Sequence, residues 1–325
     1  MSKVPAVLLS SVLVLAGLTA CSTAPATSAS DCEPVVQGGS TSTAVRVSSD
    51  LAEEPDAHFS APLDGTVTER TVAVAGDGPV VTEDTLPSVT FSIYDGTTGD
   101  EVVSTGIDAP TLATALAAQA PVIDDALQCA TGGSRLVVTL GGEDAAPLAQ
   151  AFAGYGVAAD STIVVAIDVH DVLPRVASGS PQAVFASGLP AVVQDAEGTP
   201  GINIPSTPAP STLRVAELIA GDGAPVDTDR PVLVNAMIVL WDDGQIVSSS
   251  WQDNTPSLLD VSSIAADDAM GQTFTTMLSD RTAGSRVVAV VPPENGYGAE
   301  GAGQIPGGAT QIIVLDVLGN LGDGQ

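Results

Sequence analysis

The chain has 325 residues, enough for two ordinary domains or one large domain with a sizeable core. Hydrophobic residues make up 44% of it and charged residues 15%, which excludes a chain that is disordered throughout. Acidic residues number 39 against 9 basic ones, and the formal net charge of -30 repels phosphate backbones. We therefore exclude nucleic acid as a partner.

The N-terminal segment is typical of an export signal. Residues 4–20 form an apolar run behind Lys3, too short and wrongly flanked for a stable membrane span. The run ends in Leu18-Thr19-Ala20-Cys21, which resembles the bacterial lipobox, where cleavage leaves the cysteine first and lipid-modified. We expect a signal peptide over 1–20 and an extracytoplasmic chain, anchored to the bacterial cell membrane by lipid on Cys21. The alternative is an ordinary signal peptide with a chance cysteine.

The next segment is small and polar, so residues 21–45 are predicted to be a flexible tether. Two cysteines remain, Cys32 and Cys129, and export permits them to pair. We favour a disulfide between them over two free thiols. Two cysteines without a histidine cluster make a poor metal site, so we expect neither a metal nor a cofactor.

The remaining chain reads as mostly β, with few short helices. Alternation over 88–93 predicts a strand with one buried face, and β-branched runs bounded by Gly, Pro or Asp predict five more. These runs cover 136–140, 163–169, 232–239, 286–291 and 312–318. The helical candidates are 111–120, 123–129 and 271–279.

An internal repeat organises these elements. Three segments recur in the same order with nearly constant spacing, which is the signature of duplicated units. They are VAGDG at 74–78 and IAGDG at 219–223, GSRLVV at 133–138 and GSRVVA at 284–289, and TIVVAIDV at 162–169 and TQIIVLDV at 310–317. The sequence therefore predicts two related domains, at 46–175 and 189–325, with a linker over 176–188.

The second copy resembles a known family. Residues 284–298 (GSRVVAVVPPENGYG), followed by Ile305-Pro306 and a last strand, are similar to the signature of FKBP-type peptidyl-prolyl isomerases. Residues 241–251 (WDDGQIVSSSW) resemble a second element of that family. The resemblance implies an α+β, mostly β fold, with two FKBP-like domains that are each an antiparallel sheet curled around a short helix. It also implies an apolar pocket that binds proline-containing segments of exported proteins.

Carried over by position, the resemblance assigns catalytic roles to Tyr297 and Phe274. It assigns peptide binding to four apolar residues, which are Val247, Met270, Ile305 and Ile313. A plain hydrophobic core explains Met270, Phe274 and Ile313 equally without a ligand. Two family residues are absent: the aspartate of the second element is Ser248, and the strand tyrosine is Ala236.

The first copy has lost more of the pattern. Tyr155-Gly156 is present, but no Ile-Pro follows, and the pocket floor falls on Ile123. The strand tyrosine corresponds to Tyr94 or, in another register, to Ile93. We expect this domain to be a scaffold or docking surface, and we expect the two histidines, His58 and His170, to be non-catalytic.

The function that the resemblance implies is a lipid-anchored extracytoplasmic prolyl isomerase that assists the folding of exported proteins. The chemistry needs no nucleophile or metal, because an apolar pocket can favour the twisted X-Pro amide. Two alternatives remain open. One is a non-catalytic chaperone or peptide-binding lipoprotein that kept the fold, and the other is a surface lipoprotein whose domains only act as spacers.

Overall fold

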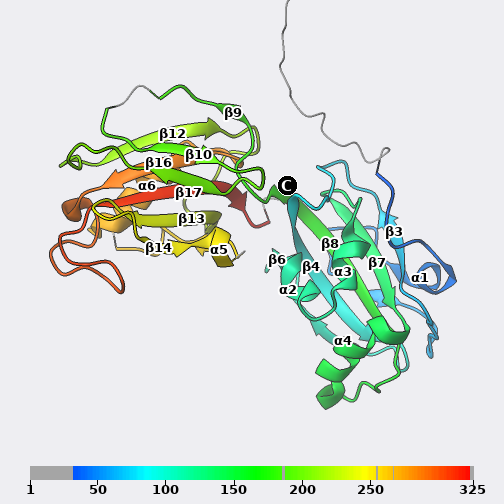
Figure 1. Cartoon of the computed structure of the whole chain (residues 1–325). Helices are drawn as coiled ribbons and strands as arrows, with labels where there is room; N and C mark the ends of the chain where they lie inside the picture. The colour runs from blue at the N-terminus through cyan, green and yellow to red at the C-terminus, as the bar shows by residue number, and fades with distance from the viewer. Residues whose placement is uncertain (1–31, 185–186, 254, 266, 323–325) are drawn as a thin grey trace, which may run out of the picture.

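The computed structural model describes residues 32–184, 187–253, 255–265 and 267–322, and shows two β units in succession along the chain (Figure 1). The leader predicted over 1–20 and Cys21 lie outside the described residues. The first unit contains α1 (Ser40–Ala44), β1 (Arg46–Val47), β2 (Ala57–His58), β3 (Glu69–Val74), β4 (Thr85–Asp95), β5 (Glu101–Ser104), β6 (Thr111–Leu112), α2 (Ala113–Ala117), α3 (Val122–Leu127), β7 (Ser134–Leu140), η2 (Gly142–Asp144), α4 (Ala146–Ala151), η3 (Ala153–Tyr155) and β8 (Ile163–Pro174).

The second unit repeats this order with fewer helices. It contains β9 (Ser180–Pro181), β10 (Ala191–Gln194), β11 (Pro200–Asn203), β12 (Arg214–Ala220), β13 (Val232–Leu240), β14 (Ile246–Ser249), α5 (Ser250–Asp253), β15 (Ser257–Leu259), α6 (Ala269–Leu278), β16 (Arg286–Val291), η4 (Pro293–Asn295) and β17 (Gln311–Asn320).

Each unit is built on one antiparallel sheet. The first sheet has the strand order β3-β7-β8-β4-β5, with β6 also paired to β4, and the second has β14-β13-β17-β16-β12-β9, with β15 also paired to β13. In each sheet the two longest strands pair with each other, β4 with β8 in the first and β13 with β17 in the second. The fold class predicted from sequence, mostly β with short helices and antiparallel sheets, is confirmed.

The central strands are apolar on both faces because both faces are covered. In β8, Ile163, Val165 and Ile167 pack with the helices of the first unit, whereas Val164 and Ala166 face the opposite side. In β17, Ile313 and Leu315 belong to a cluster with α6, and the alternate residues face away from it. This alternation is the period of two that places successive strand side chains on opposite faces.

The face without helices is covered by a hairpin that precedes each sheet. We call residues 46–58, which hold β1 and β2, the first arm, and residues 191–203, which hold β10 and β11, the second arm. Val47 of the first arm packs on Val164 and Ala166, and Val192 and Ile202 of the second arm pack in a cluster on β16 and β17.

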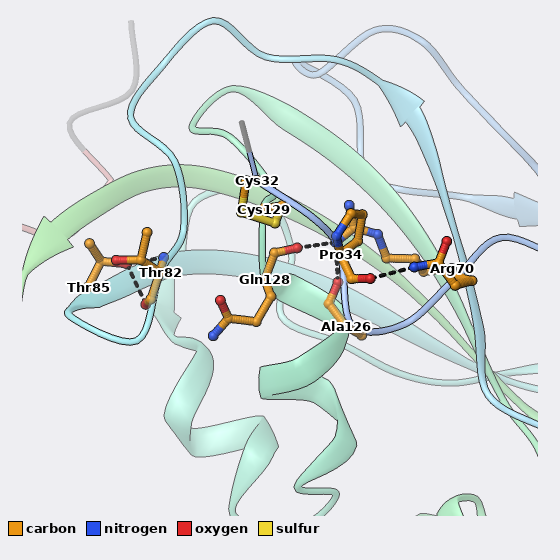
Figure 2. Close-up of a disulfide and its surroundings, with 9 residues drawn as sticks. Cys32, Pro34, Arg70, Thr82, Thr85, Ala126, Gln128 and Cys129 are labelled. Carbon is orange, nitrogen blue, oxygen red and sulfur yellow. Dashed lines mark hydrogen bonds between the residues drawn. A yellow bond between two sulfur atoms is a disulfide. The ribbon is translucent and has the colours of Figure 1, made fainter. Parts of the chain in front are cut away.

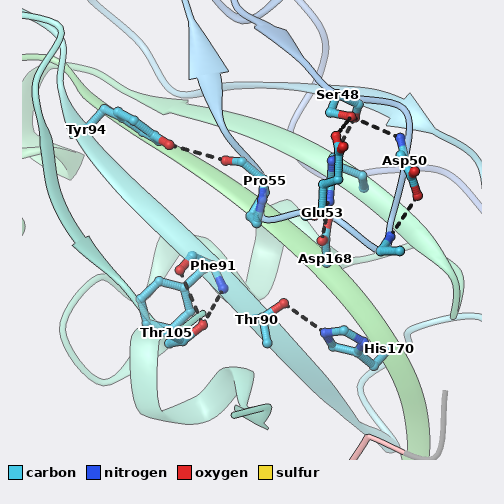
Figure 3. Close-up of polar contacts among 12 residues, drawn as sticks. Ser48, Asp50, Glu53, Pro55, Thr90, Phe91, Tyr94, Thr105, Asp168 and His170 are labelled. Carbon is cyan, nitrogen blue, oxygen red and sulfur yellow. Dashed lines mark hydrogen bonds and ion pairs between the residues drawn. The ribbon is translucent and has the colours of Figure 1, made fainter. Parts of the chain in front are cut away.

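A buried arginine–aspartate pair lies beneath each arm, at equivalent positions of the repeat. Arg135 Nε is 2.6 Å from Asp168 Oδ1, and its guanidinium also donates to the carbonyls of Ser48 and Glu53 in the first arm. Figure 3 shows Asp168 with Ser48 and Glu53 of the arm above it.

In the second unit, Arg286 Nε is likewise 2.6 Å from Asp316 Oδ1. The Arg286 guanidinium also donates to Gln194 Oε1 and to the Gly198 carbonyl of the second arm. Each pair therefore joins two sheet strands to the arm through charge-assisted, bidentate hydrogen bonds.

The N-terminal segment is folded from Cys32 onward, so the flexible tether predicted to reach residue 45 ends earlier. Cys32 is joined to Cys129 by a disulfide with a Cα–Cα distance of 5.5 Å (Figure 2). Ser42 of α1 is fully buried and bonds to Thr71 of β3 at 2.9 Å. Beside the disulfide, Arg70 donates to the carbonyls of Ala126 and Gln128 at the end of α3, where a cation is favoured by the helix dipole.

The segment predicted as a linker, 176–188, begins packed onto the second unit. Ala177 N donates to Asp316 Oδ2 at 2.8 Å, and β9 pairs with β12. One buried cluster at the junction contains four leucines, two from each unit: Leu86, Leu173, Leu233 and Leu318. The two units are therefore joined by an apolar contact as well as by the chain.

Candidate functional site

Helix α6 positions two of the residues predicted for the pocket. Its first turn is capped by Asp268, whose side chain accepts from Gly271 N at 2.6 Å. Met270 and Phe274 lie one turn apart on the side that faces the sheet, since side chains four residues apart share a helix face. Met270 is buried, and the half-buried Phe274 packs against the same apolar cluster.

The loop after β16 brings Tyr297 to this helix. Thr273 Oγ1 of α6 donates to the Asn295 carbonyl at 2.8 Å, which fixes the turn that precedes the tyrosine. Tyr297 is half-buried and packs against the cluster that contains Met270. Burial, together with the charge of Asp268, raises the pKa of the Tyr297 phenol, so it stays neutral and can donate a hydrogen bond.

Strand β17 and the loop before it place the two isoleucines. Ile313 is fully buried on the helix side of the sheet, opposite Ile238 of β13. Ile305 is buried within the 296–309 loop and exchanges two backbone hydrogen bonds with Ala302, at 3.0 and 2.8 Å. The loop backbone is left-handed at several glycines, including Gly298 and Gly301, where a Cβ would be strained.

Two predicted binding residues are not members of this cluster: Ile305, which is buried in its own loop, and Val247. Val247 is half-buried at a bulge in β14, where the register with β13 shifts between Ile238 and Val239. Ala236 faces the cluster from β13, and Ser248 is exposed. The structure thus assembles Met270, Phe274, Tyr297 and Ile313 around one apolar site.

The equivalent tyrosine of the first unit is arranged differently. Tyr155 is 77% exposed, and its ring meets the ring of Phe152 edge-on, with centroids 6.1 Å apart. Ile123, predicted as the pocket floor, is fully buried in the core. The shorter loop of this copy therefore leaves its tyrosine outside the apolar cluster.

The residue equivalent to Ala236 is neither Tyr94 nor Ile93. Ala236 pairs with Leu315, and the residue paired with the matching Ile167 is Phe91. Tyr94 lies on the arm side, where its hydroxyl accepts from Ala57 N at 3.2 Å and reaches Pro55 (Figure 3). Both assignments were therefore wrong: alternation identifies the strand but does not fix its register against a strand far away in the chain.

Gln311, which is not among the residues predicted for the site, begins β17 on the same face as Ile313. It is fully buried next to the turn that carries Tyr297. Its signal in the sequence is a polar residue inside an apolar strand, at a position where the first copy has Ile163.

A hollow lies at the junction of the two units. A cavity of about 470 Å³ is lined by residues of both, including Leu112, Thr114, Pro256, Leu258 and Leu321. Leu258 is 54% exposed beside it. This apolar hollow is separate from the α6 cluster.

Within the described residues, no group of three or more His, Cys, Asp or Glu side chains is placed to hold a metal ion. In the part of the chain that the structure describes, no helix is long and apolar enough to span a membrane.

Comparison with curated proteins gives sequence matches no longer than one unit. No protein-family model matches the chain. A probable FK506-binding protein of Corynebacterium glutamicum is 29% identical over 119 residues, which are 37% of this chain and 96% of that protein. FK506-binding protein 2 of Aspergillus oryzae is 35% identical over 80 residues, which are 25% of this chain and 57% of that protein.

Two solved structures are also similar. FkpA from Escherichia coli matches 41% of this chain and 52% of its own, with 22% identity and a TM-score of 0.29. The three FKBP domains of wheat FKBP73 match 85% of this chain and 98% of their own, with 13% identity and a TM-score of 0.31. The resemblance found in the sequence is confirmed by the two sequence matches: this chain is similar to FK506-binding proteins, to one of them over nearly that protein's full length.

Proposed function

We propose that the second unit catalyses cis–trans isomerisation of X-Pro bonds and that the first unit is a scaffold. The observation that carries this assignment is the contrast between the two tyrosines. Tyr297 packs with Met270 and Phe274 around one apolar cluster, whereas Tyr155 is 77% exposed.

The proposed mechanism is differential binding of the twisted amide. Rotation about the planar peptide bond faces a barrier of roughly 18–20 kcal/mol, because twisting removes its resonance. The side chains of Met270, Phe274 and Ile313 exclude water from the prolyl ring and its carbonyl, which favours the less polar twisted form. The neutral Tyr297 hydroxyl donates a hydrogen bond that orients the peptide backbone.

We also propose that the protein acts outside the cell membrane, anchored by lipid on Cys21, on proline-containing segments of exported proteins. The leader and lipobox support this location. The disulfide between Cys32 and Cys129 supports it independently, since such bonds persist in oxidising compartments. Replacing Cys21 with Ser is expected to release the protein from membranes, as checked by cell fractionation.

The catalytic assignment is tested with the soluble chain from Ser22 onward in a cis-to-trans proline isomerisation assay. We expect Tyr297→Ala and Phe274→Ala each to lower kcat/KM by about 10-fold or more, which corresponds to about 1.4 kcal/mol of lost transition-state stabilisation. Tyr155→Ala is the matched control, because it removes the equivalent tyrosine of the first unit, and it is expected to leave the rate unchanged. An equal loss in the Tyr155 variant contradicts the assignment to the second unit.

The second candidate function is peptide binding without catalysis. The observation in its favour is the apolar hollow at the junction, with Leu258 exposed beside it. A folded wild-type chain that leaves the rate of several X-Pro peptides unchanged, but suppresses aggregation of an unfolded client, supports this candidate. Loss of that suppression in Leu258→Ser then locates the binding surface.

A further inference from the structure

Gln311 carries a primary amide that is buried without a hydrogen-bond partner. The residue is 0% exposed, and among the described residues neither Oε1 nor Nε2 of its side chain has a partner. A buried amide that makes no hydrogen bond is destabilising, because it has lost its bonds to water and gained none. Such a group in a wall of apolar side chains points to a ligand that completes it.

The amide lies beside the apolar cluster that contains Met270 and Ile313. Gln311 is two residues before Ile313 and therefore shares its face of β17. A Cβ placed on Gly296 would lie 2.8 Å from Gln311 Nε2 and 3.5 Å from Met270 Cε. The amide and the methionine tip thus meet at the backbone that leads directly into Tyr297.

The repeat shows that packing alone does not require a glutamine here. Gln311 pairs with Val291 and Leu240, and the equivalent Ile163 pairs with Leu140 and Asp95. Ile163 is fully buried in the helix-side core of the first unit. An aliphatic residue therefore fits this position in the equivalent sheet of the first unit. The glutamine occurs in the copy whose loop tyrosine is half-buried, and the isoleucine in the copy whose loop tyrosine is exposed.

We propose that the Gln311 side chain forms hydrogen bonds with the backbone of the peptide bound in the second unit. Nε2 donates to a peptide carbonyl and Oε1 accepts from a peptide N–H, so one amide pairs with another. Proline has no N–H, so the donor is the residue before or after it. Because Gly296 covers the amide, the turn at 296–297 moves aside as the peptide enters. This inference rests on the proposed peptide-binding function of the second unit.

The test compares wild type, Gln311→Ile and a control, Gln272→Leu, in which an exposed glutamine of α6 is replaced. The probes are one X-Pro peptide and two copies of it, N-methylated on the residue before or after the proline. In wild type and in the control, one methylated peptide is expected to lose about 5-fold in kcat/KM, the size of one neutral hydrogen bond. In Gln311→Ile the unmodified peptide is expected to lose at least this factor, because both amide hydrogen bonds to the peptide are removed, with no further loss on methylation.

The thermal stability of Gln311→Ile distinguishes a peptide-binding role of the glutamine from a purely structural role. Gln311→Ile is expected to have a Tm at or above that of wild type, because it removes an unpartnered amide. A methylation penalty that persists in the variant, or a Tm that falls, overturns the proposal. If wild type binds the peptides but does not catalyse, the proposed isomerase function fails. The Kd values of the unmodified and methylated peptides, compared across the same three proteins, then decide the role of Gln311. Absence of both binding and catalysis overturns both.

Discussion

The buried pair of Arg286 and Asp316 is expected to govern the stability of the second unit. Arg286→Met keeps the apolar stem but removes the guanidinium, which leaves the Asp316 carboxylate buried with only the Ala177 N–H as a described partner. It also removes the hydrogen bonds to Gln194 and Gly198 that hold the second arm. Breaking a buried ion pair by removing one partner costs about 3–5 kcal/mol, so we expect a loss of this size.

Tryptophan fluorescence during urea unfolding measures this loss selectively. Both tryptophans, Trp241 and Trp251, lie in the second unit, and the Trp251 ring is 5.9 Å from the Arg286 guanidinium carbon. The double variant Arg286→Met/Asp316→Leu is the control, because replacing both charges with apolar groups is often nearly neutral. A loss below about 1 kcal/mol in the single variant, or a double variant that is less stable than the single one, refutes this reasoning.

Two further predictions concern the first unit. Cys129→Ser removes the crosslink between residues 97 positions apart, and by chain entropy it is expected to lower the free energy of unfolding by about 4–5 kcal/mol. Circular dichroism during urea unfolding measures this loss, and an unchanged midpoint contradicts it. Burial raises the pKa of Tyr94 to about 12, so its neutral form is favoured in the folded state. The stability that Tyr94 contributes is therefore complete below pH 10 and is lost as pH rises toward 12. Ultraviolet titration against Tyr94→Phe measures this step, and a tyrosine difference spectrum that titrates near pH 10 contradicts it.

The strands could be predicted from the sequence because β-branched runs between turn residues leave few alternatives. The run predicted at 286–291 coincides with β16, and 163–169 extends to Pro174 as β8. Helix bounds were less accurate: the stretch predicted over 111–120 begins as β6 and is helical only at Ala113–Ala117. Alanine-rich segments carry little amphipathic pattern, so tertiary pairing decides where such a helix begins.

Contacts between distant segments were the part that the sequence did not reveal. All four residues of the Arg135–Asp168 and Arg286–Asp316 pairs lie in recognised repeat segments, yet their role in holding the arms depends on carbonyls far away in the chain. The same limit applies to Val247. A bulge adds one residue to a strand and turns the following side chains to the other face, and no spacing in the sequence announces it.

The position of the disulfide determines how the first unit responds to a pull on its N-terminal end. Tension that enters at Cys32 passes through the sulfur atoms to Cys129 and bypasses residues 33–128. At roughly 3.5 Å per residue, this bypass withholds about 340 Å of chain from extension. The first arm and strands β3 to β5 lie within the bypassed segment, so stretching the first unit draws out only its part that follows Cys129.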